Sequence, residues 1–86
     1  MKKALITGIR GQDGAYLAKL LLENGYEVYG ADRRSGDSSN WRLKELGIEK
    51  YVKIVYMDLL ELTNIRHVIK DVMPDEVYNL AAQSFV

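Results

Sequence analysis

The sequence predicts an α/β fold in which helices join parallel strands. Three observations support this prediction. Short apolar runs have the length of buried strands, segments with helical periodicity separate them, and a glycine-rich turn follows the first run. Right-handed crossovers would then give a β-α-β-α-β-α-β chain whose sheet has the strand order 3-2-1-4. This arrangement is the first half of a doubly wound, Rossmann-type parallel sheet.

Four runs read as strands because apolar, β-branched and aromatic residues gather between turn signals. The first run is short and apolar throughout, as in a buried parallel strand. The second and third each lead into an aspartate, and the fourth ends in small residues. The runs comprise residues 4–6, 26–31, 52–57 and 75–82.

Three helical segments are expected between these strands. The first ends at Asn24-Gly25 and the second at Gly47, because glycine readily takes the left-handed conformation there. The third ends before Pro74, which cannot continue a helix. His67, the one histidine, lies off the apolar stripe of the third helix and is expected to be exposed rather than catalytic. The apolar positions are Tyr16, Leu17, Leu20 and Leu21 in the first helix, Trp41, Leu43 and Leu46 in the second, and Leu62, Ile65, Val68, Ile69 and Val72 in the third.

The glycine-rich turn is the most informative stretch of the chain. Glycines recur at every third position, Gly8, Gly11 and Gly14, between the first strand and the first helix. Gly8 would allow a sharp turn, Gly11 would leave bare backbone for a pyrophosphate, and Gly14 would let the helix pack closely on the strand. The helix N-terminus would offer its N–H groups to phosphates. This context favours a dinucleotide phosphate site over a simple turn.

The end of the second strand gives two opposed indications about the cofactor. Asp32 lies eighteen positions after Gly14, near the point where a Rossmann unit hydrogen-bonds the adenosine ribose, and a carboxylate there favours NAD. Arg33 and Arg34 follow at once and could clamp a 2′-phosphate, which favours NADP. A carboxylate beside a phosphate is repulsive unless it points away. The other explanation for two adjacent arginines is that they are solvated loop charges, which accounts less well for the pair. The residues therefore favour NADP, with NAD as the alternative.

The end of the third strand carries a second aspartate, Asp58, followed by Leu59. Asp58 could accept a hydrogen bond from the adenine amino group while Leu59 packs on the ring, since ligands bind at the carboxyl ends of parallel strands. Alternatively, Asp58 could cap the next helix, because Glu61 follows it at capping-box spacing. The spacing alone does not separate these two interpretations.

The end of the fourth strand has small and polar residues. Ala81 and Ala82 would allow a cofactor to approach the backbone closely, and Gln83 and Ser84 supply polar groups beside them. These residues are expected on the same edge of the sheet as the glycine turn.

Composition limits the classes of protein to consider. Eighty-six residues make at most one small domain, and the twelve basic and twelve acidic side chains cancel. A balanced charge gives no reason to expect nucleic acid or an anionic membrane as a partner. The absence of cysteine excludes a disulfide framework and a thiolate metal site, and it fits a cytoplasmic location. The apolar run after residue 3 is too short for a signal peptide or a membrane span.

Four stretches, at residues 7–14, 33–35, 58–59 and 74–84, together resemble the GDP-mannose 4,6-dehydratase family. Members of this family are extended short-chain dehydrogenases/reductases that act on nucleotide sugars. The most specific parts are Gly-Gln-Asp-Gly, which ends the first stretch, and Asn-Leu-Ala-Ala-Gln-Ser, which ends the last. The resemblance runs from the first strand to the last residue.

The resemblance implies a role for each stretch in holding NADP. Residues 8–13 would contact the pyrophosphate, the two arginines the 2′-phosphate and residues 58–59 the adenine, while residues 80–84 would line the path to the nicotinamide ribose and the sugar. The candidate cofactor-binding residues are Gly8, Ile9, Arg10, Gly11, Gln12, Asp13, Gly14, Asp32, Arg33, Arg34, Asp58, Leu59, Leu80, Ala81, Ala82, Gln83 and Ser84.

The reaction implied by the resemblance is redox-neutral. Bound NADP would take a hydride from C4 of the mannose of GDP-mannose, water would leave across C5 and C6, and the hydride would return to C6. The product would be GDP-4-dehydro-6-deoxy-mannose. The family uses a Tyr-x-x-x-Lys pair, but none of the six tyrosines here has a lysine four residues on. We therefore expect the catalytic residues to lie beyond residues 1–86, which would form the N-terminal part of a dinucleotide-binding domain.

Two residues depart from the family pattern, and other functions stay open. Asp32 stands where many relatives lack an acid, and Phe85 stands where a histidine is common. The resemblance also implies a homo-oligomer in which residues 34–40 contact a neighbouring subunit. The alternatives are another nucleotide-sugar epimerase or reductase of the same family, a non-catalytic dinucleotide-binding module, and a folding unit with no activity of its own.

Overall fold

The computed structural model describes residues 1–33 and 40–81, which form one parallel sheet covered by helices. Strands and helices alternate along the chain, as predicted. The strands are β1 (Lys3–Thr7), β2 (Glu27–Asp32), β3 (Val52–Tyr56) and β4 (Glu76–Asn79). The helices are α1 (Gln12–Glu23), α2 (Trp41–Glu45) and α3 (Leu62–Val72), with a short 3-10 turn, η1 (Glu49–Tyr51), before β3.

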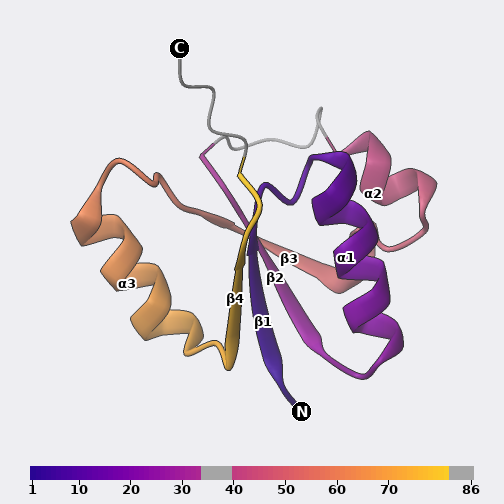
Figure 1. Cartoon of the computed structure of the whole chain (residues 1–86), viewed down its shortest axis with the longest axis horizontal. Helices are drawn as coiled ribbons and strands as arrows, with labels where there is room; N and C mark the ends of the chain where they lie inside the picture. Colours follow the sequence, from indigo (N-terminus) through magenta and orange to yellow (C-terminus); the bar gives the residue numbers. More distant parts are fainter. Residues whose placement is uncertain (34–39, 82–86) are drawn as a thin grey trace.

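The sheet of the described residues has the predicted order β3-β2-β1-β4, and every strand pair in it is parallel. Leu5 of β1 lies beside Tyr29 of β2 on one side and Val77 of β4 on the other. Figure 1 shows α1 and α2 on one face of the sheet and α3 on the opposite face. The connections through α1 and α2 therefore lie on one face, and the connection through α3, from β3 to β4, lies on the other, which puts the switch point of the sheet between β1 and β4. The carboxyl ends of the strands meet at one edge, the upper edge in Figure 1.

The core consists of two apolar layers, one on each face of the sheet. Because β1 lies in the middle of the sheet, Ala4, Leu5 and Ile6 are fully buried, which explains why this strand is apolar throughout. The buried residues of the α1 and α2 layer are Ala4, Ile6, Ile9, Ala15, Ala18, Leu21, Val28, Leu43, Ile48 and Val52. Those of the α3 layer are Leu5, Ala31, Met57, Val68 and Val72.

The predicted apolar face of α1 is partly wrong. Tyr16 and Leu20 are more than half exposed, at 56% and 55%, although they share the helical spacing of buried residues. The helix packs so closely on the end of β1 that small side chains face the sheet and these bulky ones point outward. The buried residues of α1 are Gly14, Ala15, Ala18 and Leu21.

The third helix agrees better with its prediction. It ends before Pro74, as expected. Its buried stripe is narrower than predicted, because Leu62 and Ile69 are 62% and 36% exposed. His67 is exposed, as predicted, and its Nε2 atom lies 3.1 Å from Oδ2 of Asp71 one turn later. The residues of α3 that pack against the sheet are Ile65, Val68 and Val72.

The fourth strand is shorter than predicted, since β4 ends at Asn79 rather than at residue 82. The N–H of Leu80 still donates to the carbonyl oxygen of Thr7 (3.3 Å), but the next N–H, that of Ala81, donates to the Thr7 hydroxyl. A side chain thus replaces the strand ladder at this point. Arg34, Ala82, Gln83, Ser84 and most of the predicted loop at 35–40 lie outside the described residues.

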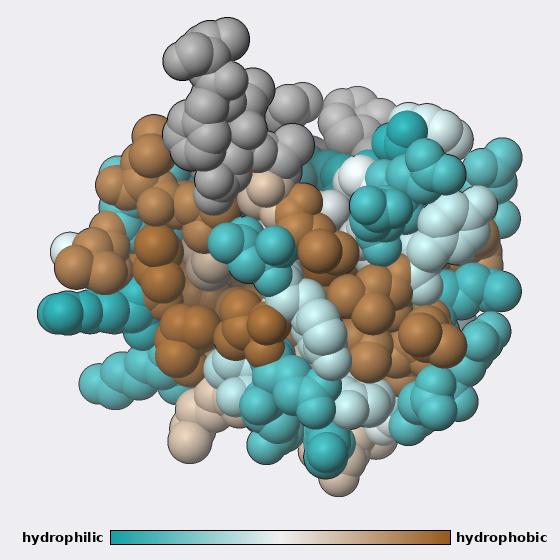
Figure 2. Space-filling model, viewed as in Figure 1, coloured by the Kyte–Doolittle hydropathy of each residue, from teal (hydrophilic) through white to brown (hydrophobic). Residues whose placement is uncertain are grey.

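Apolar side chains are also exposed on this molecule. Figure 2 shows them gathered on the viewed face on both sides of β4, over α3 and over α1. Val77 of β4, with 51% of its surface exposed, contributes to this apolar surface. Across residues 1–33 and 40–81, none of the helices has the length and apolar character needed to cross a membrane.

Candidate functional site

The glycine turn begins where β1 ends, and its first glycine is required by the fold. Gly8 has a φ of +73°, which places it in the left-handed region. A Cβ atom at Gly8 would lie 2.7 Å from the carbonyl carbon and oxygen of Leu80 and 2.8 Å from the nitrogen of Ala81. Gly8 is therefore needed both for the turn and for the close approach of the chain that leaves β4.

The other two glycines differ from each other in what surrounds them. A Cβ atom at Gly14 would lie 2.2 Å from the carbonyl oxygen of Gly8, so α1 could not pack against the turn with any larger residue there. At Gly11 the backbone is extended (φ −79°, ψ 169°), and among the described residues a Cβ atom would meet only the Gly8 oxygen, at 3.4 Å. The fold therefore requires glycine at positions 8 and 14 but leaves position 11 open.

The open backbone at Gly11 adjoins the N-terminus of α1. The N–H of Gly11 donates to the Gly8 carbonyl oxygen (3.0 Å), and Gly11 itself is the N-cap residue. No side chain among the described residues caps this end of the helix. The first-turn N–H groups and the positive end of the helix dipole thus lie beside the exposed backbone of Gly11, a position that suits an anionic group. Gln12 and Asp13 are exposed on the same turn.

The neighbouring ends of β1 and β4 are fixed together by a pair of polar residues that sequence reasoning did not place in the site. Thr7 is only 3% exposed, and its hydroxyl donates to Oδ1 of Asn79 (2.6 Å) while accepting from the N–H of Ala81 (3.2 Å). Thr7 and Asn79 are direct partners in the register of the two strands. This register, with polar residues at the ends of two otherwise apolar strands, is the signal that could have identified the pair.

Ile9 was predicted to contact the cofactor, but its side chain is fully buried. A Cβ atom at Gly30 would lie 2.5 Å from Cγ1 of Ile9, so this side chain fills the space over β2. Only the main chain of Ile9 is therefore suited to meet a ligand.

Asp32 lies at the end of β2 and is paired with a residue of the glycine turn. Its Oδ2 atom is 3.1 Å from the NH1 group of Arg10, and the two side chains are 19% and 10% exposed. The Nε of Arg10 also donates to Oδ1 of Asn40 (2.8 Å), the buried residue that precedes α2. Arg33 is exposed beside this group. The ion pair was not predicted, because it joins residues 22 positions apart that no local pattern connects.

The proposed capping role of Asp58 is wrong. Glu61, not Asp58, is the N-cap residue of α3, and it makes no side-chain cap. Asp58 instead accepts a hydrogen bond at Oδ1 from the N–H of Leu60 (2.9 Å), and its own N–H donates to Oδ1 of Asn64 (2.6 Å). Asp58 therefore stabilises the turn after β3. Leu59, beside it, is 39% exposed and available for contact with a flat apolar group.

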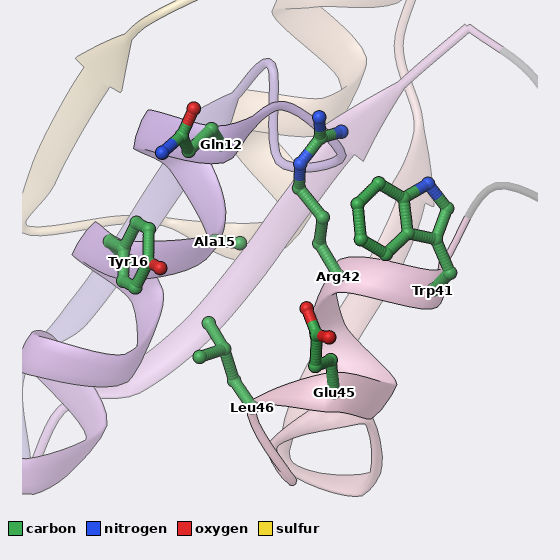
Figure 3. A pocket seen from close by; sticks show the side chains of 7 residues that line it. All are labelled: Gln12, Ala15, Tyr16, Trp41, Arg42, Glu45 and Leu46. Atoms are coloured by element: carbon green, nitrogen blue, oxygen red, sulfur yellow. The ribbon is translucent and has the colours of Figure 1, made fainter.

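A groove lies beside the glycine turn, between α1 and α2, with a volume of about 240 Å³. In Figure 3, Arg42 and Trp41 of α2 lie side by side across the groove from α1. The guanidinium carbon of Arg42 is 4.4 Å from the centre of the Trp41 ring. Among the described candidate cofactor residues, only Gln12 lines this groove. Arg42 also links the groove to the glycine turn, because its NH1 group donates to the main-chain oxygen of Arg10 (3.2 Å). The lining residues are Gln12, Ala15, Tyr16, Trp41, Arg42, Glu45 and Leu46.

The described residues contain no cluster of three or more histidine, aspartate or glutamate side chains that could hold a metal ion. The geometry instead brings together backbone and polar groups at the carboxyl edge: the glycine turn, the Thr7–Asn79 pair, and the ends of β2 and β3.

A family model described as GDP-mannose 4,6 dehydratase matches residues 5–86. The chain belongs to this family. A GDP-mannose 4,6-dehydratase of Yersinia enterocolitica is 46% identical over the whole chain, one of Cricetulus griseus is 50% identical over 99% of it, and one of Homo sapiens is 49% identical over 96% of it. In each case the chain spans 24% of the relative, about a quarter of its length. The resemblance inferred from the sequence is thereby confirmed.

Solved structures of an enzyme in complex with NAD⁺ and of an epimerase share the fold. The Bordetella bronchiseptica enzyme WbmH in complex with NAD⁺ is 34% identical with a TM-score of 0.75, and the match covers the whole of this chain and 28% of that one. The epimerase Mth375 of Methanothermobacter thermautotrophicus is 32% identical with a TM-score of 0.73, over 95% of this chain and 23% of that one. These similarities confirm the Rossmann-type architecture.

Proposed function

We propose that residues 1–86 bind NADP as the N-terminal part of a GDP-mannose 4,6-dehydratase, which converts GDP-mannose to GDP-4-dehydro-6-deoxy-mannose. The observation that carries this proposal is the contrast among the three glycines. Gly8 and Gly14 are required by packing, whereas a Cβ atom at Gly11 would meet only the Gly8 oxygen, at 3.4 Å, among residues 1–33 and 40–81. A glycine that packing does not require, at the uncapped end of α1, is best explained by a phosphate that occupies the space of the missing side chain.

Each part of the carboxyl edge then has a role in binding. The exposed backbone around Gly11 and the first turn of α1 would hold the pyrophosphate. Arg33, with Arg34 after it, would contact the adenosine 2′-phosphate, since arginine forms strong paired hydrogen bonds to phosphate oxygens. Asp58 and Leu59 would flank the adenine. The Thr7–Asn79 pair would hold Leu80 and Ala81 in place beside the path to the nicotinamide.

The family supports the substrate and the reaction. When bound, the nicotinamide supplies a hydride acceptor and donor. The residues of this chain would orient the nicotinamide ring and keep bulky side chains out of its path. They include no Tyr-x-x-x-Lys pair. The proton transfer at the sugar would therefore fall to residues of the remaining three quarters of the enzyme. We further propose that this enzyme works in the cytoplasm as a homo-oligomer, with residues 34–40 at a subunit contact.

A related function is favoured by one observation. Several solved structures with the same fold are named as epimerases, among them Mth375 at 32% identity. Another nucleotide-sugar enzyme of the family would use the same cofactor edge with a different catalytic set, so the substrate has to be tested directly.

The test uses the protein encoded by the longest reading frame that contains residues 1–86. Calorimetric titration with NADP and NAD measures binding, and mass spectrometry of the sugar nucleotide after incubation with GDP-mannose measures turnover. We expect saturable binding of NADP and a product lighter than GDP-mannose by one water. Absence of binding at millimolar concentrations of both nucleotides would contradict the cofactor proposal, and binding with conversion of GDP-mannose to an isomer of the same mass, separated from it by chromatography, would favour the epimerase.

A further inference from the structure

The carboxyl edge contains a charge arrangement that the glycine motif does not explain. Arg10 extends from the glycine turn to Asp32, at the end of β2, with 3.1 Å between NH1 and Oδ2. The same guanidinium donates from Nε to Oδ1 of Asn40 (2.8 Å). In turn, the main-chain oxygen of Arg10 accepts a hydrogen bond from NH1 of Arg42 (3.2 Å). Arg10 is thus fixed at both its backbone and its head group.

The placement follows from the topology of the sheet. Thr7 of β1 is paired with Ala31 of β2, so the turn after Thr7 and the residue after Ala31 lie side by side. Arg10 is only 10% exposed along its side chain. A guanidinium with so little contact with water interacts strongly with a carboxylate at this distance, because water screens the pair less than it would at the surface.

Asp32 stands where an unpaired carboxylate would conflict with NADP. At this position in a Rossmann-type sheet, a carboxylate accepts hydrogen bonds from the ribose hydroxyls, and its charge repels a 2′-phosphate. The proposed function, on which this inference rests, places a 2′-phosphate near Arg33, the next residue. The charge of Asp32 therefore has to be compensated for NADP to bind.

We propose that Arg10 sets the cofactor preference by holding Asp32 in an ion pair, so that the carboxylate neither receives the ribose nor repels the 2′-phosphate. Arg10 acts here as a positioning residue, through Asp32, rather than by touching the phosphate. The hydrogen bond to Asn40 supports this role, because it orients the guanidinium with its NH1 group toward Asp32.

The experiment is a double-mutant comparison in the protein encoded by the longest reading frame that contains this chain. The dissociation constants of NADP and NAD are measured by calorimetry on the same preparation, so that a partly unfolded fraction cancels in their ratio. The variants are Arg10→Ala, Arg10→Ala with Asp32→Asn, and Arg10→Lys. Arg66→Ala, which removes an exposed arginine of α3 on the other face of the sheet, is the matched control for lost charge.

We expect Arg10→Ala to shift the preference toward NAD by at least about tenfold, because it leaves the carboxylate charge without this partner. Arg10→Lys should retain most of the preference for NADP, and Arg66→Ala should retain all of it. Adding Asp32→Asn to Arg10→Ala should restore the preference to within about threefold of the wild type, because the repelling charge is then gone.

Four results overturn the inference, and each has a separate meaning. If the Arg10→Ala ratio equals that of the wild type, the ion pair has no part in selectivity while the proposed function stands. If Asp32→Asn does not restore the ratio, Arg10 acts on the phosphate directly. If the wild type prefers NAD, the inference fails together with the NADP assignment, and if it binds neither nucleotide, the proposed function itself is contradicted.

Discussion

At the amino ends of the strands, charged and phenolic side chains satisfy one another, whereas at the carboxyl ends the surface around the glycine turn is largely backbone. On the α3 face of the amino edge, Glu27 accepts hydrogen bonds from the Tyr29 hydroxyl and from Nζ of Lys53. On the α1 face, Glu76 accepts from the hydroxyls of Tyr78 (2.6 Å) and Tyr26 (3.1 Å). Glu27 thus joins β2 to β3, and Glu76 links β4 to Tyr26, the residue before β2.

At the carboxyl edge, the contacts between the described residues surround the turn. The Thr7–Asn79 bond and the Arg10–Asp32 pair lie on either side of Gly11, whose own surface is open. One edge of the sheet is therefore closed by side chains that hold the strands together. At the other edge, side-chain contacts hold the backbone in position and leave it accessible. The following substitutions test this difference between the two edges.

The largest effect is expected from Gly14→Ala. The added Cβ atom would lie 2.2 Å from the Gly8 carbonyl oxygen, so α1 would have to move away from the turn. We expect a loss of about 3 kcal/mol or more in the free energy of unfolding, measured by chemical denaturation. A stability within about 0.5 kcal/mol of the wild type would show that the contact between α1 and the turn is not tight.

A smaller loss is expected from Thr7→Val, which removes a hydroxyl without changing the shape of the side chain. The Oδ1 atom of Asn79 and the N–H of Ala81 would lose their partner, at a cost of about 1–3 kcal/mol in the free energy of unfolding. Thr7→Ser, which keeps the hydroxyl, is the control and should lose less. Equal losses in the two variants would mean that the methyl group, and not the hydrogen bonds, holds β4 against the turn.

The arginine pair at the end of β2 should affect binding rather than folding. Replacing Arg33 and Arg34 with alanine should weaken the binding of NADP by about 1–3 kcal/mol, because charged hydrogen bonds to the phosphate are lost. The affinity for NAD, measured on the same variant by calorimetry, should change little. An equal loss of affinity for the two nucleotides would show that the arginines do not contact a 2′-phosphate.

The smallest effect concerns the closed amino edge and its dependence on pH. The Tyr29 hydroxyl, and next to it Lys53, hold the pKa of Glu27 below its ordinary value of 4.5, and the Tyr78 hydroxyl does the same for the pKa of Glu76. The folded protein therefore favours the ionised carboxylates. Their contribution to stability is present above about pH 4.5 and is lost as the pH falls through the lowered values.

The measurement is the denaturation midpoint between pH 7 and pH 3. We expect the midpoint of the wild type to fall more steeply below about pH 4.5 than that of a Glu27→Gln, Glu76→Gln variant. Identical slopes would show that these two carboxylates contribute nothing to the pH dependence.

Much of the fold could be predicted because its signals are local. Glycine spacing, helix ends and the alternation of strands and helices lie within short windows of sequence, and the handedness of crossovers then determines the strand order. The exposure of Tyr16 and Leu20 was not predictable from periodicity, because it depends on how closely α1 approaches the sheet.

The candidate site was predictable only where the backbone forms it. The regular spacing of Gly8, Gly11 and Gly14 is visible in the sequence. The side chains around them, however, come from positions that are far apart along the chain. Thr7 and Asn79 are 72 residues apart, and Arg10 and Asn40 are 30 apart. No pattern within a short window reports such contacts. For Asp58 the capping-box spacing left two interpretations open, and the capping one is wrong because its carboxylate accepts from the N–H of Leu60 in a turn instead.

The most direct test of the account is the effect of Gly11→Ala on NADP affinity and on stability, measured together. A Cβ atom at this position meets only ordinary contacts within the protein but would occupy the space proposed for the pyrophosphate. We expect the free energy of unfolding to change by less than about 1 kcal/mol and NADP affinity to fall by at least about tenfold. An unchanged affinity in a stable variant would contradict the central claim that position 11 is glycine for the sake of the cofactor.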